Sequence, residues 1–108
     1  MKEQKTIRKT LKKLGVESYL RGYAYLFVAI DERIRNPEKG VFAKLWYEEM
    51  AEMHSLPIEN VFKAVELAIS VADEKQTNLY QQLFKELPSS RDFIEKTVEY
   101  LTSKEEKE

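Results

Sequence analysis

The stretch YEEMAEMHSLPIENVFKAVELAISVA, residues 47–72, decides the fold. It contains two segments with apolar residues at helical spacing, separated by a tight break at residues 55–57. Small residues that would let two helices cross closely lie on both segments: Ala51, Ala64 and Ala68. The pattern predicts a helix-turn-helix over about 47–73, whose second helix projects from the body and can enter a major groove. Two-helix corners also occur as plain packing, so the spacing by itself leaves the function open.

The rest of the chain predicts further helices, because no stretch longer than four residues alternates with the period of a strand. We therefore expect an all-α fold, a compact bundle of about six to seven helices that forms a single domain over residues 1–108. The expected helices outside the helix-turn-helix cover about 7–14, 18–36, 41–46, 79–84 and 89–101. Residues suited to begin or end helices stand at these boundaries: Gly15, Ser18, Pro57, Pro88, and Ser89 or Ser90. Residues 103–108 have no apolar side chain to bury and should fray.

The composition excludes several classes of function. The 108 residues include no cysteine, which rules out a disulfide scaffold, a thiolate zinc site and a cysteine nucleophile. The one histidine, His54, lies near Glu49 and Glu52, but this spacing fits no metal-binding motif. No carboxylate pair stands beside a plausible nucleophile, and there is no Gly-rich phosphate loop. We expect no enzyme, no catalytic residue, no metal, no cofactor and no small-molecule substrate.

No segment of the sequence predicts membrane insertion or export. The longest apolar run, Tyr23 to Ile30, is too short to span a bilayer, which takes about 20 residues. The basic start of the chain does not lead into the apolar region of a signal peptide. We therefore expect a cytoplasmic protein without a membrane partner.

The net charge of −1 hides an asymmetry along the chain. Residues 1–21 contain seven basic and two acidic groups, a net +5, whereas residues 22–108 contain 11 basic and 17 acidic groups, a net −6. The basic first helix either contacts DNA backbone or an acidic partner, or is a solvated cap anchored by its apolar side. From Pro57 to Lys75 the net charge is −2, whereas a surface that binds nucleic acid is usually basic.

Several short runs of sequence are informative in combination: LGV at 14–16, RGYAYL at 21–26, AI at 29–30, NVFKAVELAISVA at 60–72 and LF at 83–84. In this order they resemble the C-terminal effector domain of the stage-zero sporulation response regulator of spore-forming Firmicutes. The similarity extends from about Leu11 to Leu101. It implies an all-helical domain that binds promoter DNA through a helix-turn-helix. The resemblance covers only the effector domain, so it does not imply dimerisation driven by phosphorylation.

The resemblance implies that the polar side of the second helix faces DNA. Asn60 can pair with adenine, and Lys63 can reach guanine or a phosphate. The residues expected to bind DNA lie in the turn and along this side of the helix: Ser55, Glu59, Asn60, Lys63 and Glu66. The first hypothesis is therefore a DNA-binding transcriptional regulator of the sporulation effector type, with duplex DNA as its partner.

The buried positions of this helix match the family's pattern, but most of the positions that face DNA do not. Phe62 replaces an acid, Glu66 replaces an arginine, and Leu67 replaces a histidine. Three carboxylates in the preceding helix, at 48, 49 and 52, oppose the counterion release that drives phosphate binding. Phe62 and Leu67 either form an exposed patch that binds a partner protein or a second copy, or they pack under a neighbouring helix. The second hypothesis is a degenerate helix-turn-helix that acts as a protein-interaction module or homodimeric antagonist, without specific DNA binding.

Overall fold

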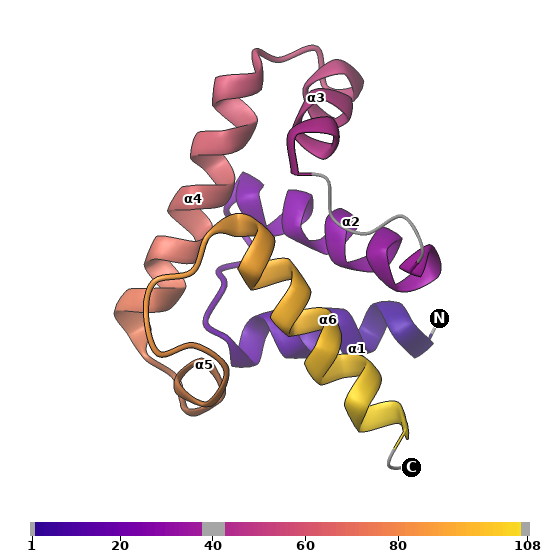
Figure 1. The fold of residues 1–108 in the computed structure, drawn as a ribbon. Coiled ribbons are helices and arrows are strands. Elements are labelled where there is room, and N and C mark those ends of the chain that lie inside the picture. Colours follow the sequence, from indigo (N-terminus) through magenta and orange to yellow (C-terminus); the bar gives the residue numbers. More distant parts are fainter. Residues whose placement is uncertain (1, 38–42, 107–108) are drawn as a thin grey trace.

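A computed structural model describes residues 2–37 and 43–106 of the chain, and this part contains six helices and no strand (Figure 1). The predicted all-α fold is confirmed. The helices are α1 (Lys2–Lys13), α2 (Arg21–Arg35), α3 (Ala43–Met53), α4 (Ile58–Lys75), α5 (Asn78–Leu83) and α6 (Ser90–Glu106). Within the described residues, no helix has both the length and the apolar character required to cross a membrane.

Helix α2 is the centre of the bundle, because it packs against α1, α4 and α6 (Figure 1). All six helices contribute buried side chains to one apolar cluster. Helix α1 joins this cluster through Ile7 and Leu11, with Leu14 directly after it, as their spacing predicts. Burying side chains of this size stabilises the fold by roughly 1.5–3 kcal/mol each.

Helices α2 and α4 approach each other closely at Gly22. A Cβ atom at Gly22 would lie 2.2 Å from the carbonyl oxygen of Ala64 and 2.7 Å from the Cβ of Ala68. Only glycine therefore fits here, in the first turn of α2, although its helix propensity is lower than that of alanine by up to about 1 kcal/mol. The sequence pattern predicts that α4 crosses α3 closely at Ala64 and Ala68. In the structure, the helix that approaches α4 closely at these two residues is α2. This contact fixes α4 against the body.

Gly15 ends the first helical block, as predicted. Its φ is +89°, which is accessible to glycine at little cost. The N–H of Gly15 donates to the carbonyl of Lys12 and that of Val16 donates to the carbonyl of Leu11, each at 3.0 Å. This pair of bonds is a Schellman motif, and it satisfies carbonyls that would otherwise lack partners at the end of α1.

The prediction that Ser18 caps α2 is wrong. Leu20 occupies the N-cap position, and its side chain makes no capping hydrogen bond. A backbone turn precedes the helix instead, in which the N–H of Leu20 donates to the carbonyl of Glu17 at 3.2 Å. The start of α2 is therefore fixed by packing at Gly22 and by this turn, not by a serine hydroxyl.

The prediction of two separate helices, at 41–46 and about 47–54, is also wrong, because residues 43–53 form the single helix α3. No glycine or proline interrupts this stretch, so a helix can continue through it. Residues 41 and 42 lie outside the described part of the chain. Pro57 is the N-cap of α4 and not its first helical residue, a shift of one position.

The last two helices have polar caps. The side chain of Thr77 accepts a hydrogen bond from the N–H of Tyr80 at 3.2 Å at the start of α5. Ser89 accepts from the N–H of Asp92 at 3.2 Å, which confirms it as the cap of α6. Helix α6 continues to Glu106, past residue 103 where fraying is expected.

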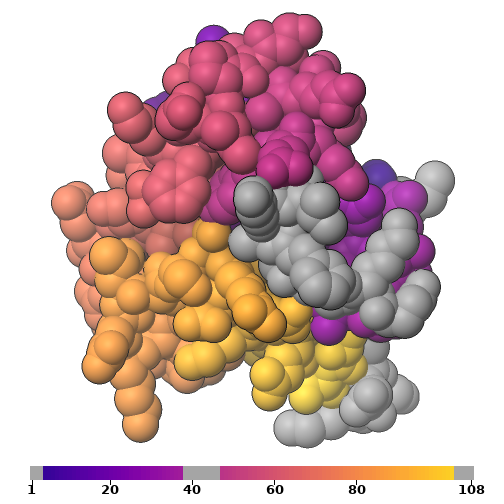
Figure 2. Space-filling view, turned by 45° about the horizontal axis from the view of Figure 1, so that its top comes forward, coloured from indigo at the N-terminus to yellow at the C-terminus, as the bar shows by residue number. Residues whose placement is uncertain are grey.

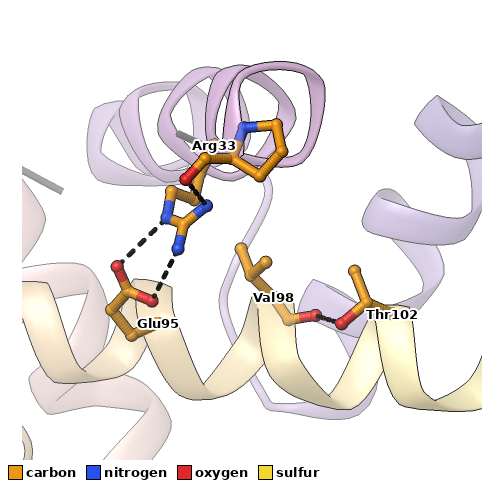
Figure 3. Close-up of polar contacts among 5 residues, drawn as sticks. Arg33, Glu95, Val98 and Thr102 are labelled. Atoms are coloured by element: carbon orange, nitrogen blue, oxygen red, sulfur yellow. Dashed lines mark hydrogen bonds and ion pairs between the residues drawn. The ribbon is translucent and has the colours of Figure 1, made fainter. Parts of the chain in front are cut away.

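One ion pair joins the end of α2 to α6 (Figure 3). Arg33 Nε lies 3.1 Å from Glu95 Oε1, and its Nη1 donates to the carbonyl of Pro37 at 2.9 Å. The arginine thus holds both α6 and the chain that leaves α2. Because its guanidinium is partly shielded from solvent, this pair should stabilise the fold by more than a fully exposed one.

Candidate nucleic-acid interface on helix α4

The turn between α3 and α4 is a second Schellman motif. The N–H of Ser55 donates to the carbonyl of Glu52 at 3.2 Å, and that of Leu56 donates to the carbonyl of Ala51 at 2.9 Å. Ser55 has a φ of +53°, in the left-handed region that costs a residue other than glycine about 1–2 kcal/mol. Pro57 then starts α4 in an extended conformation. The predicted tight break is confirmed, and its backbone reverses the chain without a glycine.

Helix α4 has one buried and one exposed side. Its buried residues are Val61, Val65, Ala68, Ile69 and Ala72. Asn60 and Lys63 are exposed and three residues apart, so they lie on the same side of the helix. Their side chains make no hydrogen bond or ion pair with any residue in the described part of the chain. Both are therefore available to a ligand one to two turns from the start of α4.

The exposed side of α4 is acidic on balance. Glu59, Glu66 and Glu74 are exposed, and Glu59 lies in the first turn, where a carboxylate stabilises the helix dipole. Of the two lysines in α4, Lys75 forms an ion pair with Glu17, whereas Lys63 forms none. The three carboxylates of α3, at 48, 49 and 52, are exposed as well. The structure thus presents a polar helix with little positive charge.

Phe62 and Leu67 are not buried under a neighbouring helix. Phe62 is 43% exposed although its ring lies edge-on to that of Tyr47, with centroids 5.4 Å apart, and Leu67 is 53% exposed. Both line a groove of about 450 Å³ between α4 and the connection from α5 to α6. The full lining is Phe62, Glu66, Leu67, Ile69, Ser70, Leu87, Pro88, Ser89 and Ser90. In Figure 2 the start of α6 and the connection before it, in orange, adjoin α4.

Sequence reasoning missed Leu87, which is 60% exposed in the same groove. The available signal was an isolated leucine before Pro88 in a polar stretch, with no helical periodicity to bury it. It also missed a hydrogen bond to Ser90, a residue that lines the groove. The hydroxyl of Tyr47 donates to Ser90 Oγ at 2.5 Å, and burial raises the pKa of that phenol.

The family model described as "Sporulation initiation factor Spo0A C terminal" matches residues 7–102, nearly the whole chain. The chain belongs to this family. The Spo0A C-terminal family is the DNA-binding effector domain of the sporulation factor. No curated protein matches the chain.

Phe62, Glu66 and Leu67, the positions at which the resemblance predicts a departure from the family's pattern, are all exposed at the surface. None of these side chains is needed to complete the apolar core. The apolar side of α4 thus packs against the body without these three side chains.

The basic side chains of α1 form a separate surface. Lys5, Lys9, Lys12 and Lys13 are exposed, and the guanidinium of Arg8 lies 5.4 Å from the ring centroid of Phe27. Figure 1 places α1 on the other side of the bundle from the turn between α3 and α4. The basic side chains of α1 are therefore not brought to the turn before α4.

His54 is exposed at the end of α3, and its ring centroid lies 5.5 Å from that of Tyr25. The described residues include no group of three or more histidine or acidic side chains placed to hold a metal ion. The imidazole of His54 thus lies beside an aromatic ring.

Proposed function

We propose that this protein is a transcriptional regulator of the sporulation effector type that acts in the cytoplasm and binds duplex DNA through the exposed side of α4. Membership of the Spo0A C-terminal family, a DNA-binding and not an enzymatic family, supports the proposal. The observation that carries it is the placement of Asn60 and Lys63, both exposed and unpaired, directly after a tight helix-turn-helix corner. The proposal requires no catalytic residue, metal or cofactor.

Each proposed contact follows from side-chain chemistry. Asn60 can form two hydrogen bonds with adenine in the major groove, and Lys63 can donate to guanine or to a phosphate. The hydroxyl of Ser55 is exposed in the turn, where a phosphate can accept from it. Glu59 and Glu66 can accept from the amino group of cytosine. With little positive charge on α4, we expect affinity through this helix to depend more on base contacts than on phosphates.

Fluorescence anisotropy with a labelled duplex at about 50 mM salt tests the proposal, because low salt favours every phosphate contact. We expect Asn60→Ala and Lys63→Ala each to weaken binding by roughly 1–3 kcal/mol. Matched controls are Asn78→Ala and Lys96→Ala, which remove the same groups from exposed positions on α5 and α6. Absence of binding, or equal effects of the controls and the α4 variants, refutes the proposal.

A second candidate function is that of a protein-interaction module without specific DNA binding. The exposure of Phe62 and Leu67, together with the acidic α3, favours it. It predicts that Phe62→Asp abolishes capture of a protein partner, whereas Asn60→Ala and Lys63→Ala change nothing. Retention of the partner by Phe62→Asp would exclude this candidate.

A further inference from the structure

The exposed side of α1 is covered with cations. Five basic side chains are exposed there, and together they are called the basic ridge: Lys5, Arg8, Lys9, Lys12 and Lys13. The other side of the helix belongs to the core, where Ile7 and Leu11 are 1% and 0% exposed. Along residues 4–13, α1 therefore offers a partner positive charge and no exposed apolar side chain.

The charges of the basic ridge repel one another within the helix. Lys5, Lys9 and Lys13 follow one another at intervals of four residues, and the other two cations form a parallel row. Like charges at this spacing destabilise a helix. The helix dipole favours cations in the last turn, where Lys12 and Lys13 lie. The stability of α1 thus does not account for the cations in its earlier turns.

The described part of the chain does little to neutralise the basic ridge. None of its four lysines forms an ion pair with a described residue. Arg8 lies over the aromatic ring of Phe27, 5.4 Å from its centroid. Helix α5, which packs against α1, has no charged residue. Glu17, the first acid after α1 in the sequence, is paired with Lys75. The counter-charge of the basic ridge is therefore left to solvent ions or to a ligand.

The chemistry of the basic ridge fits a phosphate backbone better than a protein or a membrane. Protein interfaces are apolar at their centre and poor in lysine. Helices that lie on membranes insert their apolar side, which α1 buries in the core. A stripe of basic residues along a helix is instead typical of a surface that binds nucleic acid. From Lys5 to Lys13 the helix extends roughly 12 Å, a length over which duplex DNA carries about seven phosphates.

We propose that the basic ridge binds the phosphate backbone of duplex DNA without reading its sequence. Each cation that contacts a phosphate releases condensed counterions, and the phosphates relieve the repulsion within α1. The basic ridge lies on the other side of the bundle from the turn before α4 (Figure 1). It is therefore a second DNA contact, separate from the one proposed for α4, and it does not depend on base recognition by that helix.

Binding of a random-sequence duplex tests the basic ridge, because this probe offers no preferred site. The ridge variant replaces three lysines with glutamine: Lys5→Gln, Lys9→Gln and Lys13→Gln. The matched control removes the same charge from exposed positions before and on α6: Lys85→Gln, Arg91→Gln and Lys96→Gln. Fluorescence anisotropy from about 50 to 200 mM salt gives the affinity and the slope of log K against log salt for each protein.

We expect the ridge variant to bind roughly tenfold or more weakly than the wild type at the lowest salt. Its slope should be less steep by roughly 2–3 units, because three phosphate contacts are lost. The control should bind with an affinity and slope close to those of the wild type. Equal changes in the two variants, or no binding of the random-sequence duplex by the wild type, overturn the proposal. Circular dichroism verifies folding, which the removal of mutually repelling charges should preserve.

Other polyanions test the assignment to nucleic acid. Polyglutamate and vesicles of phosphatidylcholine and phosphatidylserine are used in place of the duplex, and we expect both to bind more weakly than DNA. If either binds as tightly as DNA and the ridge variant loses this binding, the assignment is overturned.

Variants of α4 keep the two DNA contacts apart. The double variant Asn60→Ala/Lys63→Ala should retain most of the binding of the random-sequence duplex, because the basic ridge is intact. Loss of this binding in the double variant would assign it to α4 and overturn the proposal. The ridge variant should keep any base preference of the wild type. Each proposal can therefore fail alone.

Discussion

The contact between α2 and α4 allows a sharp prediction for Gly22→Ala. The new methyl group would lie 2.2 Å from a backbone oxygen of α4, a separation that requires the helices to move apart. Overpacking of this kind costs about 1–3 kcal/mol and more when backbone must shift. The higher helix propensity of alanine offsets up to about 1 kcal/mol of this. We expect a net loss of roughly 2 kcal/mol in the free energy of unfolding.

Thermal and urea denaturation followed by circular dichroism measure this loss. For a chain of about 100 residues, 2 kcal/mol lowers Tm by roughly 8–16 °C. The control is Ala24→Gly, at an exposed position of the same helix, which should cost only the propensity difference of about 1 kcal/mol. Adding Ala68→Gly to Gly22→Ala should restore little, because the carbonyl of Ala64 still blocks the methyl group. A Gly22→Ala protein as stable as the wild type would refute the close packing.

Two further predictions concern single residues and use the same denaturation assays. Ser55→Gly should raise the free energy of unfolding by about 0.5–1 kcal/mol, because it relieves the left-handed conformation; a loss of stability would contradict the turn geometry. Tyr80 is buried and donates to Asp73 Oδ1 at 2.8 Å, and burial and this carboxylate raise the pKa of its phenol above the usual 10.0. As the pH rises, this phenol therefore loses its proton in the unfolded chain before it does so in the folded protein. The free energy of unfolding should fall above about pH 10, and it should fall less steeply for Tyr80→Phe than for the wild type. Parallel pH profiles for the two proteins would contradict this.

Local sequence signals predicted much of the fold. The spacing of Ile7, Leu11 and Leu14 predicted which side of α1 is buried, and Gly15 predicted where this helical block ends. The tight break at residues 55–57 predicted the corner between α3 and α4. These signals succeed because helix periodicity and turn chemistry depend on neighbours in sequence.

Features created by tertiary contact could not be predicted. Gly22 is required by the carbonyl of Ala64, which is distant in sequence, so within α2 alone it looks like a weak helix residue. From the sequence alone, Lys75 is expected to be a free cation of α4, but in the structure it forms an ion pair with Glu17, which precedes α2. The groove depends on Leu87 lying beside α4, and no periodicity connects these two segments.

The candidate site was predicted in part. Sequence reasoning placed Asn60 and Lys63 on one exposed side of the second helix, and the structure has them there. It left the burial of Phe62 and Leu67 open, because helical spacing does not determine whether a neighbouring helix covers a flank. Which of these residues contact a ligand stays a prediction.

The salt dependence of DNA binding tests the central claim most directly. A plot of log K against log salt from about 50 to 200 mM counts phosphate contacts, with a slope of roughly −0.9 per contact. If Lys63 contacts a phosphate, Lys63→Ala should make the slope less steep by about one unit. If Lys63 instead reads guanine, the variant should lose about 1–3 kcal/mol of binding free energy for DNA that has guanine at the contacted position. Asn60→Ala should reduce affinity without changing the slope. Identical affinity, slope and base preference for wild type and Lys63→Ala, or no binding at the lowest salt, would contradict DNA recognition by α4.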